Sequence, residues 1–259
     1  MLLRMKHYET IELKVQDDVA ILTFNRPEFL NAMNLQMMNE IIDSLEMIIN
    51  DSSLRVAVIT GNGRSFMAGA DIKEYAIQTP EQFKDFQQKG TKLYQIIENA
   101  DIPFIAAVNG FALGGGFEIS LACDFIIAVD SAKMGLPEVH LGLIPGGGGT
   151  QRLLYKIGMN RVKEMLMMGQ SYSAKQMLEW GVVNVICPDD DLETTINVTV
   201  DKFKRRPSQS LRAIKKLLHP DVIESPFRDR IAKEGDEVFD LFYTPIAQNL
   251  IKQFTKKNQ

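Results

Sequence analysis

The sequence contains very little cysteine. The two thiols, Cys123 and Cys187, lie far apart in apolar surroundings. Two distant cysteines form neither a disulfide framework nor a CxxC metal site, and no spacing of His or Cys matches a set of metal ligands. We therefore expect a protein of a reducing compartment that binds no metal.

Long apolar runs and excess positive charge are also missing. No run approaches the roughly 18 apolar residues that span a bilayer, and the first residues lack the apolar segment of a leader. The 29 Lys and Arg residues against 33 Asp and Glu residues give a net charge of −4. This balance does not favour nucleic-acid binding, which depends on clustered Lys and Arg. The sequence predicts a soluble cytoplasmic protein with no leader and no membrane or nucleic-acid partner.

The 259 residues are 45% hydrophobic and 24% charged, which is ordinary for a globular protein with a sizeable core. Short apolar runs alternate with segments of helical periodicity, and this alternation predicts an α/β fold. The expected strands are 19–24, 55–60, 104–108 and 125–129. The expected helices are 35–50, 81–99 and one that begins near Gly115.

The pattern changes after Gly158. Helices are expected over 161–169 and 173–181, and the chain is helical with Pro breaks from about Val200 onward. We expect residues 1–199 to form the core with the active site and residues 200–259 to form a helical region. The apolar side chains of this region exceed what it can bury alone, which favours oligomerisation. They are Phe239, Leu241, Phe242, Leu250, Ile251 and Phe254.

Three glycine-rich segments, 61–63, 114–116 and 146–149, do not match a phosphate loop. No Lys-Ser or Lys-Thr pair follows the last glycine, and no GxGxxG opens a βαβ unit. The segment 114–116 lies between a predicted strand and a helix, where free N–H groups and the helix dipole can hold a developing negative charge. This is the geometry of an oxyanion hole, although a tight turn with positive φ explains the same glycines.

Two acidic residues are candidates for proton transfer. Glu118 stands among apolar residues, so burial would raise its pKa as a general acid or base requires. The structural alternative is that the negative charge of Glu118 stabilises the N-terminus of its helix. Glu138 lies in a loop rich in Gly and Pro, and taken alone it is a solvated loop acid.

The segment 68–73 is a third candidate site. Its small residues Ala68, Gly69 and Ala70 let a ligand lie against the main chain, and Lys73 can meet an anionic group. The structural alternative is an ordinary loop in which Asp71 caps a helix.

Taken together, these segments resemble the crotonase family, also called the enoyl-CoA hydratase/isomerase superfamily. The resemblance covers nearly the whole chain. It rests on NRP at 25–27, NAMN at 31–34, AGADIK at 68–73, AAVNG at 106–110, ALGGGFE at 112–118, LPE at 136–138 and LIPGGGGTQR at 143–152.

The resemblance implies a spiral of repeated ββα units and a C-terminal helical region that builds trimers, commonly paired into hexamers. It implies an acyl-coenzyme A thioester as ligand, with no separate cofactor because coenzyme A is part of the substrate. The N–H groups of Ala70 and Gly115 would form the oxyanion hole. The coenzyme A arm would pass Ala68, Ala70, Asp71, Ile72, Lys73 and Gly115, and Phe254 and Lys257 would reach a neighbouring subunit's ligand.

By the same resemblance, Glu118 matches the glutamate that activates water and Glu138 the one that delivers a proton to C2. Members that only shift a double bond usually keep a single glutamate. The implied activity is therefore a hydro-lyase, enoyl-CoA hydratase, which converts trans-2-enoyl-CoA reversibly into 3-hydroxyacyl-CoA. Such enzymes serve fatty-acid metabolism and β-oxidation. Many hydratases carry an acidic stretch where this chain has the segment 244–253. The resemblance therefore does not fix the depth of the acyl pocket or the preferred chain length.

Four alternatives remain to be weighed. An enoyl-CoA isomerase and a hydratase of a branched or specialised acyl thioester share the fold. An RNA-binding homologue is not favoured, because helix 35–50 contains no Lys or Arg. A peptidase is not favoured either, because Ser120 lies inside an apolar helix and no GxSxG elbow occurs. A lone loop histidine such as His140 more often serves packing than catalysis.

Overall fold

The structure is a computed structural model that describes residues 7–242, 244–247 and 249. The described residues divide into two compact units between Asp201 and Lys202, and each unit is considered by itself. The boundary expected after residue 199 falls inside the same helix, α7 (Leu192–Lys204).

The first sheet of the first unit contains six strands among the described residues, in the order β1-β2-β3-β5-β7-β10. The strands are β1 (Ile11–Gln16), β2 (Val19–Phe24), β3 (Val56–Gly61), β5 (Phe104–Val108), β7 (Phe125–Val129) and β10 (Val185–Cys187). β1 pairs antiparallel with β2, and the other pairs are parallel. All five residues of β5 are buried, as expected for a parallel strand covered on both faces.

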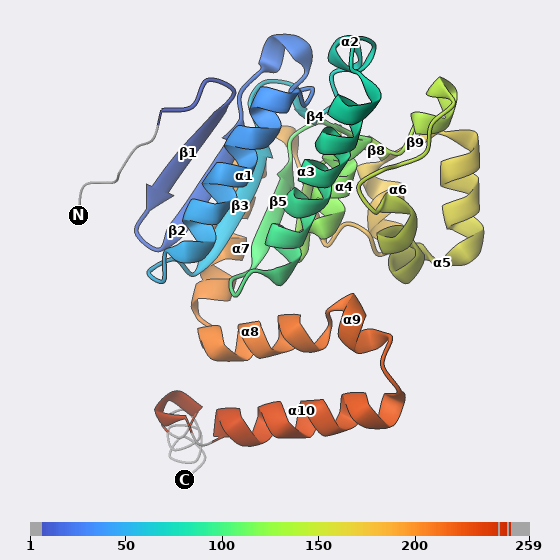
Figure 1. The fold of residues 1–259 in the computed structure, drawn as a ribbon. Coiled ribbons are helices and arrows are strands. Elements are labelled where there is room, and N and C mark those ends of the chain that lie inside the picture. Colours follow the sequence, from blue (N-terminus) through green and yellow to red (C-terminus); the bar gives the residue numbers. More distant parts are fainter. Residues whose placement is uncertain (1–6, 243, 248, 250–259) are drawn as a thin grey trace. The chain divides into compact units, whose positions relative to one another are not determined.

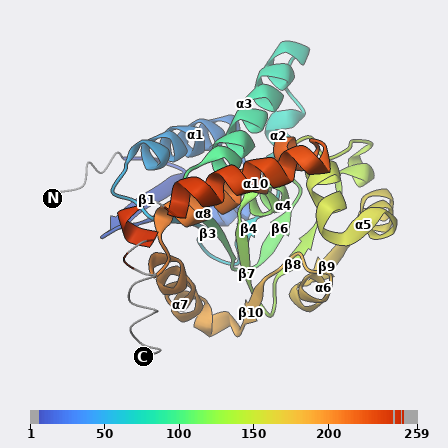
Figure 2. The same cartoon turned by 90° about the horizontal axis from the view of Figure 1, so that it is seen from below.

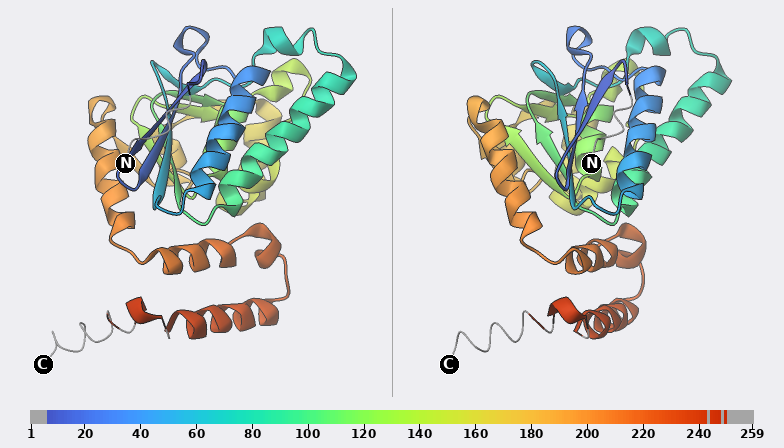
Figure 3. Two further views of the ribbon diagram at one scale, coloured as in Figure 1. Left: turned by 60° about the vertical axis from the view of Figure 1, so that its left-hand side comes forward. Right: turned by 90° about the vertical axis from the view of Figure 1, so that its left-hand side faces the viewer.

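Helices α1 (Leu35–Asn50) and α3 (Pro80–Asn99) lie side by side over one face of this sheet (Figure 1). The turned views show the same pair on the same side (Figure 3). The side chain of Asn34 caps α1, and a reciprocal pair of hydrogen bonds between Thr79 and Gln82 caps α3. Both helices bury an apolar face, which is why their periodicity is visible in the sequence.

A second sheet contains four short strands among the described residues, in the order β4-β6-β8-β9 (Figure 2). They are β4 (Ser65–Met67), β6 (Phe111–Leu113), β8 (Lys133–Gly135) and β9 (Ser171–Ser173). Along the chain β4 follows β3, β6 follows β5 and β8 follows β7, and each pair leads into a helical segment. The order is the same in both sheets, so the chain winds as a spiral of ββα repeats. The expected α/β spiral is confirmed.

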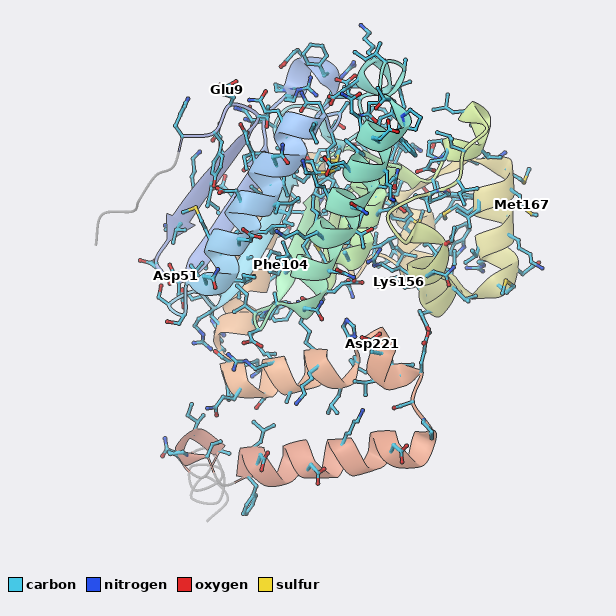
Figure 4. All side chains as sticks on the ribbon, viewed as in Figure 1. Glu9, Asp51, Phe104, Lys156, Met167 and Asp221 are labelled. Atoms are coloured by element: carbon cyan, nitrogen blue, oxygen red, sulfur yellow. The ribbon has the colours of Figure 1, made fainter. Side chains whose placement is uncertain are left out.

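The other helical segments of the first unit surround these sheets. They are η1 (Pro27–Phe29), α2 (Ile72–Tyr75), α4 (Gly115–Ala122), η2 (Glu138–Leu141), α5 (Gly149–Met168), α6 (Ala174–Glu179) and η3 (Asp189–Asp191). Gly158, with φ 75° and ψ 161°, divides α5 into two helical segments. The sequence predicted the segment after Gly158 and missed the one before it. Met167 lies on the outer side of α5 (Figure 4).

The second unit is helical throughout its described residues, as predicted. It contains the end of α7, then α8 (Ser208–Leu217), α9 (Pro220–Ile223) and α10 (Phe227–Phe242). Val238, Phe242 and Ile246 are exposed, while Leu250, Ile251 and Phe254 lie outside the described residues. Within residues 7–242, 244–247 and 249, we find no helix with the length and apolarity that a membrane span requires.

Asn31 ties together the turns that precede the second sheet. Its side chain is fully buried, accepts a hydrogen bond from Arg26 N at 2.8 Å, and donates to the carbonyls of Asn62 at 3.0 Å and Ser65 at 2.7 Å. Its backbone has φ 56°, a conformation that Asn tolerates better than most residues.

We predict that Asn31→Ala lowers the free energy of unfolding by about 2–3 kcal/mol, because it leaves buried polar groups without partners. Urea unfolding followed by circular dichroism measures this loss. The exposed Asn50, which donates one hydrogen bond to Glu46 O, is the matched control. Asn50→Ala should change stability by less than about 0.5 kcal/mol. Equal effects of the two substitutions would contradict the role of Asn31.

Candidate active site

A cavity of about 380 Å³ opens in the first unit, within the size range of small-molecule sites. Its walls come from five places in the chain: the segments that follow β4, β6 and β8, one face of α3, and Met33 and Met38 at the start of α1. Because β4, β6 and β8 are parallel and adjacent, their carboxyl ends meet at the same edge of the sheet. This pairing brings Ala70, Gly115 and Glu138 to one place, although up to 68 positions separate them (138 − 70).

The main-chain N–H of Ala70 is left free by the way its neighbours pair. Met33 N donates to Gly69 O at 2.8 Å, and Asp71 N donates to Met33 O at 2.9 Å. Ala70 lies between these two residues, and its own N–H takes part in neither hydrogen bond. No described group accepts a hydrogen bond from Ala70 N–H, and Ala70 lines the cavity.

Gly115 contributes a second free N–H group. It is the first residue of α4, where helix geometry leaves the N–H without an intrahelical acceptor. The described residues offer no other acceptor, and Gly115 lines the cavity. Gly114 before it has φ 51°, so the tight-turn explanation of these glycines is true as well.

Glu118 lies one turn after Gly115 and is only 2% exposed. Its Oε1 accepts hydrogen bonds from Gly147 N and Gly149 N, both at 2.8 Å. Burial raises the pKa of this carboxyl, while the two N–H groups and the nearby Arg152 act to lower it. The carboxylate therefore binds a distant glycine loop rather than the first turn of its own helix.

Glu138 begins η2 after β8 and lines the same cavity. Its Oε2 is buried without a hydrogen-bond partner among the described residues. Burial, assisted by the negative charge of Glu118, raises the pKa of Glu138 to about 7. The surroundings of the two carboxyl groups therefore affect their pKa values differently. Glu118 is stabilised as the anion by two N–H donors, whereas Glu138 retains a proton up to near neutral pH.

One face of α3, together with the end of α2, forms the apolar wall of the cavity. The ring of Tyr75 packs edge-to-face against Phe83 at 5.5 Å and against Phe86 at 5.0 Å between centroids. Gln87, Gly90 and Tyr94 continue this wall along α3. These residues were not among the predicted site residues, although their spacing of three and four positions marks a single helical face.

Most of the residues expected along the coenzyme A arm line the cavity. These are Ala68, Ala70, Ile72 and Gly115, whereas Asp71 and Lys73 do not line it. Asp71 caps α2 by accepting a hydrogen bond from Lys73 N at 3.2 Å, and it pairs with Arg26 at 3.2 Å. Lys73 is exposed. Phe254 and Lys257 lie outside the described residues.

Two further candidates have structural partners. Ser120 is buried and its hydroxyl donates to Phe117 O at 2.7 Å, which does not suit an exposed nucleophile. His140 lines the cavity, and its Nε2 lies 3.1 Å from Gly169 O. Among the described residues, no group of three or more His, Cys, Asp or Glu side chains is arranged to hold a metal ion.

The fold agrees with comparisons against known proteins. The chain belongs to the Enoyl-CoA hydratase/isomerase family, which it matches over residues 14–256. It is 34% identical over 248 residues to the Short-chain-enoyl-CoA hydratase of Clostridium acetobutylicum, and the alignment covers 95% of each chain. It is 40% identical over 186 residues to the Crotonyl-CoA hydratase of Syntrophomonas wolfei, covering 71% of this chain and 72% of that protein.

A solved structure shows the same fold. The crystal structure of Enoyl-CoA Hydratase from Bacillus anthracis matches with a TM-score of 0.91 and 33% sequence identity. The match covers 96% of this chain and 97% of that chain.

The raised pKa of Glu138 makes the free energy of unfolding depend on pH. Between pH 4.5, its ordinary value, and about pH 7, the folded state binds more protons than the unfolded state. Stability therefore falls as the pH rises through this window. We predict that Glu138→Gln removes this fall and is more stable than the parent protein above pH 7, by about 1–2 kcal/mol after allowance for partial solvent screening.

Urea unfolding between pH 4 and pH 8 measures the difference, with the exposed Glu81→Gln as the control. The gain should vanish below about pH 4.5, where Glu138 is protonated in both states. A gain that is constant across the pH range would show that the carboxyl does not titrate as described.

Proposed function

We propose that this protein is an enoyl-CoA hydratase, which adds water across the C2=C3 bond of a trans-2-enoyl-CoA to form a 3-hydroxyacyl-CoA. One observation carries the proposal: the carboxyl groups of Glu118 and Glu138 line a single cavity together with the free N–H groups of Ala70 and Gly115. The names of the relatives from Clostridium acetobutylicum and Syntrophomonas wolfei support the same reaction. Fatty-acid metabolism is the corresponding role.

The two N–H groups would bind the thioester carbonyl oxygen. As water adds at C3, negative charge develops on this oxygen, and donors that are already in place stabilise it without reorganisation. Removal of one such donor from an oxyanion hole typically costs about 3–4 kcal/mol. The N-terminal end of α4 adds the positive end of a helix dipole at Gly115.

The two carboxyl groups would divide the proton transfers. The Glu118 carboxylate takes a proton from water, whose oxygen bonds to C3, and the electron pair of C2=C3 moves toward the thioester to form the enolate. Protonated Glu138 then gives its proton to C2. The product has gained one water. Glu118 now holds a proton and Glu138 has lost one, and exchange with solvent restores both groups.

This chemistry uses no separate cofactor, because coenzyme A is part of the substrate. The coenzyme A arm would enter past Ala68 and Ile72, continue near Asp71 and Lys73, and meet Phe254 and Lys257 of a neighbouring subunit. We propose a trimer or a dimer of trimers. The exposed apolar side chains Val238, Phe242 and Ile246 support association of the helical region, and light scattering with size-exclusion chromatography tests it.

The loss of ultraviolet absorbance of crotonyl-CoA tests the proposed function. We predict rapid hydration by the parent protein and a fall in kcat of about 10²–10⁴-fold in Glu118→Gln and in Glu138→Gln. KM should stay within about threefold, since each substitution removes the group that accepts or gives the proton and leaves the shape of the side chain nearly unchanged. Glu81→Gln is the control. Near-parental turnover by either variant would contradict its assignment, and conversion of 3-enoyl thioesters without any hydration would favour an isomerase.

The absence of a side chain at Gly90 affects which acyl chains fit in the cavity. It is buried on the cavity face of α3, about one turn or 6 Å from Tyr94. A methyl group at this position would lie 3.8 Å from Met38 Cε and Tyr94 Cε2, which is ordinary contact. The missing side chain therefore leaves space in the pocket, and an alanine fits there without a clash.

We predict that Gly90→Ala raises stability by about 1 kcal/mol through helix propensity, and that Gly90→Leu blocks the apolar end of the cavity. Turnover of crotonyl-CoA should stay within about threefold in Gly90→Ala, whereas turnover of ten-carbon enoyl-CoA should fall at least tenfold in Gly90→Leu relative to crotonyl-CoA. Parallel losses on both chain lengths would contradict a selective role for Gly90.

A further inference from the structure

Arg152 lies behind the glycine loop of residues 147–149 and does not line the cavity. Its Nη1 donates a hydrogen bond to the carbonyl oxygen of Gly147. Its guanidinium also lies over the ring of Tyr94, with 5.3 Å between Cζ and the ring centroid. Arg152 therefore contacts the loop without lining the cavity.

Glu98 fixes the orientation of this guanidinium. Arg152 Nε lies 2.5 Å from Glu98 Oε1 and Nη2 lies 2.7 Å from Oε2, and both side chains are less than 20% exposed. Two parallel bonds to one carboxylate restrict a guanidinium more than a single contact does. The pair joins α5 to α3 across 54 positions of sequence.

The loop is narrow enough for this contact because it consists of glycine. A Cβ on Gly147 would come within 2.3–2.5 Å of the ring and hydroxyl of Tyr94. A Cβ on Gly148 would come within 2.4 Å of Arg152 Nη1, and the backbone there has φ +88°. The loop is thus held between Tyr94 and Arg152, and its N–H groups at 147 and 149 reach Glu118 Oε1.

We propose that Arg152, held by Glu98, is a positioning residue for the hydration reaction: it fixes the 147–149 loop so that two N–H groups bind one oxygen of Glu118 and leave the other oxygen for water. This role rests on the proposed hydratase function. This role explains why glycines occupy positions 147–149, why Arg152 follows them, and why Glu98 lies on α3.

The charge of Arg152 adds to this geometry. The groups that face Glu118 are Arg152 from α5, Glu138 from η2, Tyr94 from α3 and Tyr75 from α2. Arg152 acts against the effect of burial and lowers the pKa of Glu118, and the negative charge of Glu118 in turn raises the pKa of Glu138. Loss of the guanidinium therefore requires a higher pH to ionise the base.

The pH profile of kcat for crotonyl-CoA hydration separates this role from a purely structural one. The test variant is Glu98→Gln with Arg152→Gln, which leaves no unpaired buried charge. We expect kcat to fall about 10–100-fold, KM to stay within about threefold, and the low-pH decline of kcat to move up by about one pH unit. Arg152→Lys retains the charge and should keep the decline near its original pH, with part of kcat restored.

Arg161→Gln is the matched control, because Arg161 lies on the same helix and packs over Trp180, 4.8 Å from the ring centroid. Its profile should be unchanged. A folded double variant whose low-pH decline does not move, or whose kcat stays within twofold, would overturn the role of Arg152. The same upward shift in Arg152→Lys would overturn the charge argument. Absence of hydration by the parent protein would instead overturn the proposed function.

Discussion

Main-chain hydrogen bonds between β4, β6 and β8 hold the ends of three short parallel strands side by side, and the site depends on this pairing. Each strand ends in a different segment that faces the cavity: Ala70 after β4, Gly115 after β6 and Glu138 after β8. The two N–H groups are free because of local geometry, one between paired neighbours and one at a helix start. The spiral therefore positions two backbone N–H donors. A side-chain substitution does not remove a backbone N–H group.

The same arrangement places the two glutamates in different surroundings. Glu118 is more deeply buried, yet it accepts two N–H hydrogen bonds that stabilise its anion, whereas Glu138 has a buried oxygen with no partner among the described residues. Burial raises the pKa of both groups, and two N–H hydrogen bonds and Arg152 oppose this effect at Glu118. In the proposed mechanism the glycine loop 147–149 orients the base, and Arg152 on α5, paired with Glu98 on α3, holds this loop.

Sequence patterns predicted the long elements well and the short ones poorly. Strands 19–24, 104–108 and 125–129 and helix 35–50 have the predicted bounds, since each has an apolar pattern long enough to read. The strands of three residues carry no periodicity, so the second sheet was missed. Glu118 could be proposed from its apolar neighbours, and Ala70, Gly115 and Glu138 from the family resemblance. Arg152 could not, because its role depends on contacts with residues 98 and 147 that sequence spacing does not show.

We propose that the free N–H groups of Ala70 and Gly115 bind one thioester oxygen beside the two glutamates. A crystal structure of the protein with an unreactive acyl-CoA analogue would show this contact. We expect a thioester oxygen within hydrogen-bonding distance, about 3 Å, of both nitrogens, with C2 and C3 facing Glu138 and Glu118. A bound analogue whose carbonyl lies away from this pair of nitrogens would contradict it.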